Sequence, residues 1–264
     1  MIVKKLQANI INNHVNYEHP YYLQSLNLWI DQTVSFSWNG SRVCIGCSRS
    51  QKKIIQGYCY LCSQRLACCD LCIVKPELCH FHLGTCREPQ WGLMNCMQSH
   101  VIYLSLTSHP KIGITRLTQL PTRWIDQGAV WAVPLARTQS RYHAGLLEVL
   151  LAEDLSDQTA WRKLIMGDIE HVEDRLLLAQ KTQMRVQEVA DLKKIPIHIE
   201  PLEFVDMIYP VTAFLKKPTT INLEKNPTFI DTLLGIKGQY LLFKELGAIN
   251  MRKYTGFDLT LELA

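Results

Sequence analysis

Two cysteine pairs with the same internal spacing are the first residues of this chain that could do chemistry. Cys44 and Cys47 are separated by two residues, and so are Cys59 and Cys62. Each pair can form a tight turn around one ion, and four thiolates in a tetrahedron suit Zn²⁺. Because four thiolates leave no open coordination position, the spacing predicts a structural zinc site of the zinc-ribbon type. The alternative is that these residues are small core side chains or a redox pair.

A second group of potential ligands follows, and its composition leaves several ligand sets open. We favour a second structural zinc bound by Cys72, Cys79, Cys86 and Cys96, with His80 and His100 as alternative ligands. Three further residues, Cys68, Cys69 and His82, are interpreted as small core, packed or surface residues. The segment has few large aliphatic side chains, so metal binding would replace a missing hydrophobic core.

The residues after the cysteines alternate between apolar and polar types and then change to a helical pattern. VIYLSL and KIGIT are typical of two short strands, and the turn-forming residues TSHP join them. A helix is expected to begin after Thr118 or Thr122 and to end at Gly128. A strand over 129–136 and a helix over 139–153 complete the order strand, strand, helix, strand, helix.

This order and two short motifs resemble the GIY-YIG nuclease domain. Val101-Ile102-Tyr103 lies where that family has Gly-Ile-Tyr, and Lys111-Ile112-Gly113 lies where it has Tyr-Ile-Gly. The resemblance implies that Arg123 is the family's arginine on the first helix. It also implies that Glu148 is the family's metal-binding glutamate.

Longer segments extend the resemblance over most of the chain. CIVKPELCHFHLGTCREPQWG, HVIYLS, KIGITR, PTRWIDQGA and GIKGQYLLF are similar to an uncharacterised bacterial family of domain-of-unknown-function proteins. That family joins a zinc-ribbon region to a GIY-YIG-like module. The resemblance therefore implies an architecture, and it implies no settled activity.

The resemblance implies a set of roles in phosphodiester hydrolysis. Tyr103 would orient or deprotonate a water, and Arg123 would bind the phosphate through its planar fork of donors. Glu148 would bind Mg²⁺ or Mn²⁺, and Lys111 would contact a phosphate as a point charge.

Each role has a structural alternative, and the helix of Glu148 offers further candidates. Tyr103 could be a half-buried aromatic, Arg123 could pair with Asp126 on its own helix, and Glu148 could be a solvated helix residue. The second-line candidates on the same helix as Glu148 are Arg141, Tyr142 and His143.

Composition bounds the class of protein. The 264 residues are 47% hydrophobic and 20% charged with a net charge of +4, which is globular and compatible with a nucleic-acid partner. No run of 18 apolar residues exists, so no membrane-spanning helix is expected. The first residues are not typical of a signal peptide, so a cytoplasmic location is predicted, where cysteines serve as metal ligands more often than as disulfides.

The predicted fold class is α+β. It comprises a Cys-rich zinc-ribbon region, a GIY-YIG-like ββαβα module and a small β domain that could be built from both chain ends. Residues 160–192 are expected to form one or two packing helices, and Asn39-Gly40 is predicted to be a hairpin turn. The expected segments are an N-terminal β segment, a Cys-rich region, the module with its following helices and a C-terminal β-rich segment, at residues 1–43, 44–100, 101–192 and 193–264.

Two functions of different classes follow. The first is a metal-dependent nuclease that hydrolyses DNA or RNA and is positioned by zinc-ribbon modules. The second is a catalytically silent zinc protein that binds nucleic acid or acts as a protein adaptor. A thiol redox or metal-sensing role for the additional cysteines is a third, weaker hypothesis. None of these involves a membrane.

Overall fold

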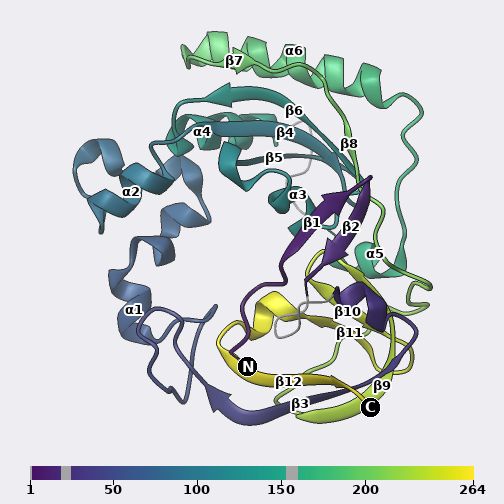
Figure 1. Cartoon of the computed structure of the whole chain (residues 1–264). Coiled ribbons are helices and arrows are strands. Elements are labelled where there is room, and N and C mark those ends of the chain that lie inside the picture. The colour runs from purple at the N-terminus through teal and green to yellow at the C-terminus, as the bar shows by residue number, and fades with distance from the viewer. Residues whose placement is uncertain (1, 19–24, 153–159) are drawn as a thin grey trace.

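The structure is a computed structural model, and it describes residues 2–18, 25–152 and 160–264. The chain has a mixed α+β fold with several sheets, which confirms the predicted class. Two β units lie one above the other (Figure 1). The hairpin of β1 (Ala8–Ile11) and β2 (His14–Tyr17) lies across the junction of the two units, and a Cys-rich arm that contains α1 (Tyr60–Arg65) and α2 (Pro89–Asn95) lies along their left side in Figure 1.

The upper unit is an antiparallel sheet with helices packed on both faces. β4 (His100–Leu106) pairs with β5 (Pro110–Arg116) and with β6 (Trp131–Thr138), and the order is β5-β4-β6-β7. The short strands β7 (His198–Ile199) and β8 (Val205–Asp206) both pair with β6.

Helices follow the strands of this unit in the expected order. α3 (Thr122–Asp126) lies between β5 and β6, and α4 (Arg141–Leu151) follows β6 and starts at the N-cap Ser140. The predicted end of this last helix at Glu153 lies outside the described residues. α5 (Trp161–Met166) and α6 (Arg175–Lys193) match the expected helical stretch over 160–192.

Alternation along the strands sends side chains to two cores. Ile102 and Leu104 of β4 pack with α4 and α6 in one buried cluster. Val101 and Tyr103, on the other face, pack with α3 and with the lower unit in a second cluster. Both faces of β4 are therefore buried, which explains its nearly continuous apolar sequence.

The lower unit is a five-stranded sheet to which distant parts of the chain contribute. Its order is β11-β10-β9-β3-β12, and β3 near the N-terminus pairs with β12 at the C-terminus. The long strand β9 was not anticipated from the sequence. The strands are β3 (Thr33–Arg42), β9 (Thr228–Lys237), β10 (Tyr240–Phe243), β11 (Gly247–Asn250) and β12 (Phe257–Leu263).

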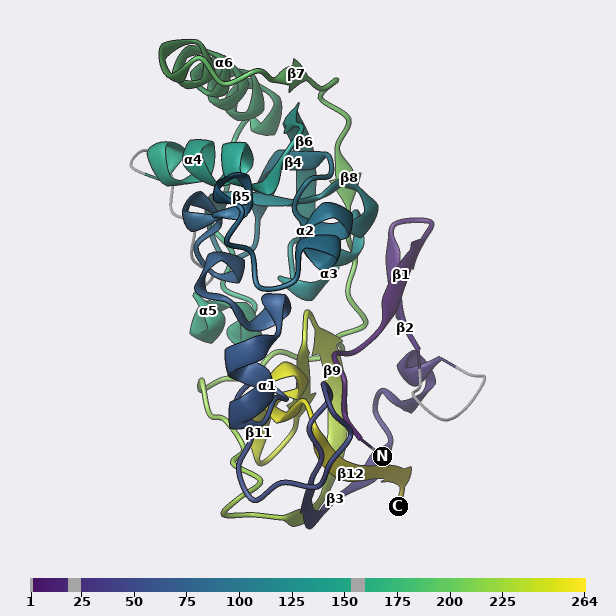
Figure 2. The same cartoon turned by 90° about the vertical axis from the view of Figure 1, so that its left-hand side faces the viewer.

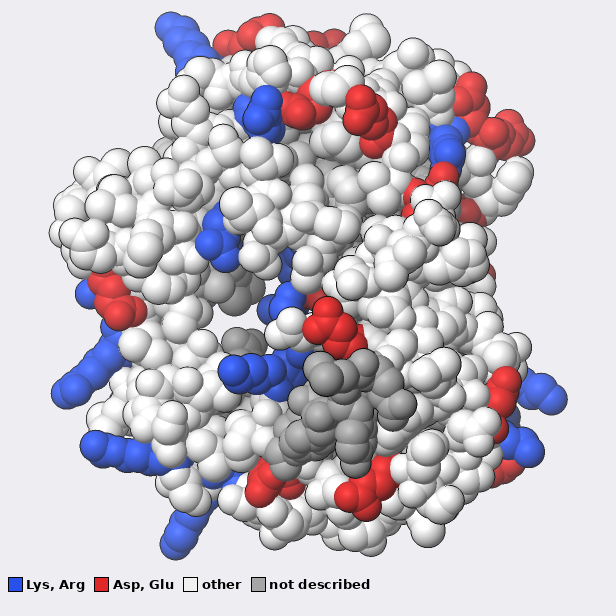
Figure 3. Space-filling view, in the orientation of Figure 1, with Lys and Arg blue, Asp and Glu red and all other residues white. Residues whose placement is uncertain are grey.

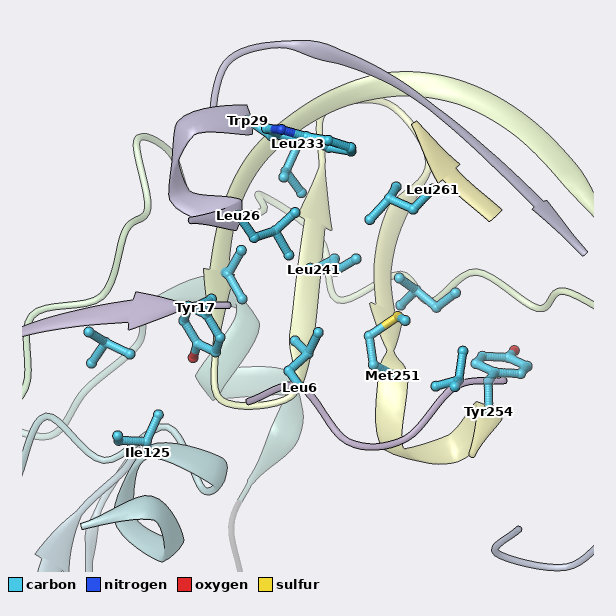
Figure 4. Packing of buried hydrophobic residues seen from close by; sticks show 14 of the residues in the cluster. Leu6, Tyr17, Leu26, Trp29, Ile125, Leu233, Leu241, Met251, Tyr254 and Leu261 are labelled. Carbon is cyan, nitrogen blue, oxygen red and sulfur yellow. The ribbon is translucent and has the colours of Figure 1, made fainter. Parts of the chain in front are cut away.

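A continuous apolar core joins the two units. Figure 4 shows Leu6 and Tyr17 of the N-terminal segment beside Leu241 of the lower sheet, with Ile125 of α3 approaching from the upper unit. The Tyr17 hydroxyl donates to the carbonyl oxygen of Gly238, 2.9 Å away. Since α3 carries Arg123, the lower unit fixes the position of one predicted site residue.

The predicted hairpin turn at Asn39-Gly40 is wrong. Both residues lie within β3, opposite a register shift in β12, and Gly40 has a φ of +84°. The Asn39 amide donates to Asp258 at 2.7 Å, and its side-chain oxygen accepts from the Ser41 N–H at 2.9 Å. The left-handed conformation that Asn-Gly favours therefore serves a β-bulge, which needs the same backbone geometry as a turn.

The Cys-rich arm has little regular structure. From α1 to α2 it runs from the lower unit to the upper one (Figure 2). Many of its large apolar side chains are exposed, so the described residues give it little core of their own. Among the described residues of the whole chain, 3₁₀ turns lie at Leu26–Trp29, Ala67–Cys69, Leu71–Ile73, Pro76–Leu78, Phe81–Leu83, Leu117–Gln119 and Met251–Tyr254.

Within the described residues, no helix is both long enough and apolar enough to cross a membrane.

Candidate functional site

The four predicted ligands of the first zinc site lie together. The sulfur atoms of Cys44, Cys47, Cys59 and Cys62 are all within 4.8 Å of one another. The first pair follows β3, and the second lies at the start of α1. A Cβ atom on Gly46 would lie 3.3 Å from the Cys62 sulfur, so the tight turn of the first pair leaves little room beside that ligand. The group could hold a zinc ion.

The electrostatics of this group favour a bound cation. Burial opposes ionisation of Cys44, but N–H groups of Cys59, Cys47 and Gly46 directed at its sulfur lower its pKa to about 6. Burial and the neighbouring thiols raise the pKa of Cys62 to about 12. Without a cation the group therefore cannot carry four thiolates at neutral pH, whereas a divalent ion would stabilise all of them.

The predicted second site is assembled more loosely. Cys72, Cys79 and Cys96 are buried in one cluster, and all three line a single small cavity with Cys86. The three-residue group of this region whose ligand atoms all lie within 4.8 Å of one another, however, is Asp70, Cys72 and His80. The four cysteines are not grouped at that distance within the described residues.

The alternative ligand His100 lies elsewhere. Its ring is buried in β4, its Nδ1 lies 2.7 Å from the carbonyl oxygen of Gln98, and it does not line the cavity. Burial lowers the pKa of His100 to about 4, so the ring is neutral. Of the remaining candidates, His82 is exposed and packs on Tyr142, and Cys68 and Cys69 are half-buried, with the Cys68 sulfur 3.3 Å from the Tyr58 hydroxyl.

Tyr103 and Arg123 meet at a residue that the sequence reasoning missed. The Tyr103 hydroxyl lies 2.9 Å from the side-chain amide of Gln127. With the amide NH₂ turned toward Tyr103, the amide oxygen accepts from Nη2 and Nε of Arg123 at 3.1 and 3.2 Å. Gln127 follows Arg123 by four residues, so helical spacing was the available signal.

Glu148 approaches the same region from α4. Its Oε1 accepts a hydrogen bond from the backbone N–H of Ile114, 3.2 Å away, at the outer edge of β5. The carboxylate is close enough to Tyr103 to raise the pKa of that phenol. Tyr103, Arg123 and Glu148 therefore lie in one region, which comprises β4, the edge strand β5, α3 and α4.

Burial limits what the tyrosine can do. Tyr103 is fully buried, and its ring lies over Gly113, where a Cβ atom would be 2.6 Å from the phenol oxygen. Burial raises the pKa of Tyr103, although the Arg123 guanidinium partly opposes the shift. The phenol therefore remains protonated at neutral pH, and its expected role as a base has no support in this conformation. Lys111 on β5 is also buried.

The expected alternative for Arg123 does not occur. Asp126 instead accepts from Lys5 at 2.8 Å and from Gln239 at 3.0 Å. Its carboxylate thus joins α3 to the N-terminal segment and to the start of β10.

Arg141, a second-line candidate, contacts the Cys-rich arm. Its Nη2 donates to the carbonyl oxygen of Ile73 at 2.6 Å, and its Nε donates to that of Cys72 at 3.4 Å. Its backbone N–H donates to the carbonyl oxygen of Cys96 at 2.8 Å. These bonds fix the start of α4 on the arm, which is a positioning role. Tyr142 packs against the same cysteine cluster, and its ring also lies near that of His143.

Comparisons with known proteins identify a family and no more. Neither the curated proteins nor the solved structures contain a match to this chain. Residues 31–259 match the family described as "Protein of unknown function (DUF2797)". The match covers most of the chain, including both cysteine clusters and the region of Tyr103, so the protein belongs to the DUF2797 family.

Proposed function

We propose that this protein is a metal-dependent phosphodiesterase that acts on nucleic acid, with a GIY-YIG-like module carried beside a zinc-ribbon arm. The observation that carries the proposal is the hydrogen-bonded series Tyr103, Gln127 and Arg123 beside the Glu148 carboxylate. These side chains come from strands and helices in the order strand, strand, helix, strand, helix.

Each residue is given the role that its side-chain chemistry allows. Arg123 offers planar donors to a phosphate, and Gln127 fixes the orientation of its guanidinium. Tyr103 stays protonated, so it would orient the reacting water through a hydrogen bond and would not deprotonate it. Lys111, which pairs with Ser105 across the two strands, adds positive charge on the same face of the sheet as Tyr103.

Glu148 is the residue that would hold a divalent ion. Mg²⁺ and Mn²⁺ accept one carboxylate and complete their coordination with water and substrate phosphate, so a single glutamate fits such an ion. The bound ion would supply charge stabilisation to the phosphate and lower the pKa of a bound water. The Ile114 N–H holds one carboxylate oxygen in place.

The arm supplies the second part of the proposal. The four thiols of Cys44, Cys47, Cys59 and Cys62 would bind zinc as a structural ion. In Figure 3 the surface is hollowed between the arm and the two β units, and Lys and Arg side chains lie at the border of this hollow. The Lys and Arg side chains of this border attract a phosphate backbone through charge, and the Asp and Glu side chains beside them in Figure 3 oppose that attraction.

The test removes the charge of Glu148 and keeps its hydrogen bond. Glu148→Gln retains an acceptor for the Ile114 N–H, so the edge of β5 stays capped. Glu188→Gln makes the same chemical change on exposed α6 and serves as the control. The full chain is incubated with labelled single- and double-stranded DNA and RNA in Mg²⁺ or Mn²⁺. We expect cleavage by the wild type and by the control, and a loss of about 100-fold or more in Glu148→Gln.

Equal cleavage by wild type and Glu148→Gln would indicate a contaminating nuclease and refute the proposal. One observation favours a second candidate, a binding protein without catalysis: Tyr103 and Lys111 are 0% and 3% exposed. In that case none of the three proteins would cleave in the presence of metal, yet the wild type would bind nucleic acid with an affinity that falls steeply with salt.

A further inference from the structure

The cluster around Cys72 and Cys79 lies outside the zinc-ribbon group and outside the region of Tyr103. We propose that Cys72, Cys79, Cys86 and Cys96 bind a second thiophilic metal ion of the zinc class. This ion would fasten the Cys-rich arm to the start of α4. The inference is independent of the proposed phosphodiesterase activity, because it rests on the cysteine cluster and its contacts with the start of α4 and assumes no reaction.

Burial and shape single out this cluster among the remaining thiols. Cys72, Cys79 and Cys96 are 7%, 4% and 3% exposed, and Phe81 and Trp91 pack around them. The cavity that they share with Cys86 has a volume of about 10 Å³. That is the space of about one water molecule, so it admits a single ion and excludes an organic ligand. Burying so many thiols around one small space is typical of a metal site.

Charged groups around the cavity match a thiolate-bound ion. Four thiolates and one divalent ion carry a net charge of about −2, which cations nearby must balance. Arg141 reaches the carbonyl oxygens of Cys72 and Ile73, and Arg87 pairs with Asp70 at 2.6 Å. The Arg141 guanidinium is therefore held next to the cysteines by bonds that do not use the sulfur atoms, whereas the charge of Arg87 is offset by Asp70, which lines the same cavity.

The fourth ligand is assigned to Cys86 over His80. The His80 ring is engaged on both sides, since Nδ1 lies 2.7 Å from Thr85 Oγ1 and Nε2 lies 3.6 Å from Asp70 Oδ2. Cys86 also faces the cavity, and a Cβ atom on Gly92 would lie 3.1 Å from its sulfur. Because the four sulfur atoms are not grouped within 4.8 Å, ion binding requires the cluster to contract.

Contraction would act directly on α4. Cys96 accepts from the Arg141 N–H at 2.8 Å, and the Arg141 side chain binds the carbonyl oxygens of Cys72 and Ile73. One turn later, a Cβ atom on Gly145 would lie 2.5 Å from the backbone nitrogen of Glu77. An ion that joins Cys72 and Cys79 to Cys96 would therefore hold the arm against the start of α4.

The test counts metal ions in the full chain. Native mass spectrometry and elemental analysis of the zinc-loaded wild type should give two zinc ions per chain. Cys79→Ser/Cys96→Ser should give one, and the matched control Cys68→Ser/Cys69→Ser, which changes two cysteines of the same arm, should keep two. One zinc ion in the wild type would overturn the proposal, and so would two ions in Cys79→Ser/Cys96→Ser.

Cobalt substitution identifies the fourth ligand. The number of zinc ions in the wild type remains a test of the site even if a cysteine variant fails to fold. Co²⁺ bound by four thiolates gives intense sulfur-to-metal absorption, and the absorption of the second ion should be lost in Cys86→Ser and kept in His80→Ala. The reverse result would overturn the assignment of Cys86 in favour of His80. If Cys79→Ser/Cys96→Ser does not fold, two ions in the wild type and in Cys68→Ser/Cys69→Ser support the site.

Discussion

Lys237 offers a direct test of how tightly the two β units are packed. Its side chain is 1% exposed at the end of β9, and burial lowers its pKa from 10.5 to about 8. At about 1.4 kcal/mol per pKa unit, keeping this amine charged costs the folded state about 3 kcal/mol at pH 7. The rings of Phe214 and Tyr209, 5.3 and 5.8 Å from the ammonium nitrogen, offset part of that cost. We therefore expect Lys237→Met to stabilise the protein by about 1–3 kcal/mol at pH 7.

The sign of the pH dependence follows from the lowered pKa. Below pH 8 the folded and unfolded chains both bind the proton, so the full cost of the buried charge is present. Between pH 8 and 10.5 the folded state releases the proton while the unfolded state keeps it, so the wild type gains stability relative to Lys237→Met as the pH rises. The advantage of the variant should therefore shrink toward zero as the pH approaches 10.5.

Urea unfolding at pH 7, 8, 9 and about 10 measures this difference. The wild type and Lys237→Met contain the same cysteines and the same buried tyrosines. The contributions of metal binding and of tyrosine ionisation to the free energy of unfolding therefore cancel in the comparison. Lys244→Met, at an exposed position just after β10, is the control and should be nearly neutral at every pH. A Lys237→Met effect that is destabilising, or that does not change with pH, would mean that the amine is hydrated, and the tight packing inferred here would be refuted.

Two further substitutions test the contacts around the candidate site. Gly145→Ala places a methyl group about 2.5 Å from the backbone of residues 76–77. Although alanine favours a helix more than glycine does, this clash should lower the free energy of unfolding by about 1–3 kcal/mol. An increase in the free energy of unfolding would show that α4 does not pack rigidly on the arm. Tyr103→Phe removes a buried hydroxyl from the Gln127 amide and should cost about 1–2 kcal/mol, whereas the exposed control Tyr60→Phe should be neutral. Equal unfolding midpoints for the two tyrosine variants would contradict the buried bond.

Local signals in the sequence predicted the elements that short-range physics determines. The two CxxC pairs each need only four consecutive residues to form, and the strands on either side of TSHP meet through one short turn. The start of α4 is also local, because the Ser140 side chain accepts from the His143 N–H. Such features depend little on the rest of the fold, so spacing and alternation were sufficient.

The features that the sequence did not reveal depend on distant partners. β9 pairs with β3, which lies about two hundred residues earlier in the chain, and no local pattern identifies that partner. Asn39-Gly40 has the same backbone preference in a turn and in a bulge, and only the register of β12 decides between them. Gln127 carries no catalytic signature by type, and its role follows only from the positions of Tyr103 and Arg123.

One face of α4 links the two halves of the proposed chemistry. Arg141, Gly145 and Glu148 follow one another at spacings of four and three residues, so they lie on the same side of the helix. The first two contact the arm, and the third bonds the edge of β5. Because a helix of eleven residues moves as a rigid body, a shift of the arm at Arg141 would be transmitted to the Glu148 carboxylate two turns away. In the proposed function, metal in the arm would therefore support the geometry of Glu148 without taking part in any reaction there, and this would connect the thiolate sites to the single acidic residue.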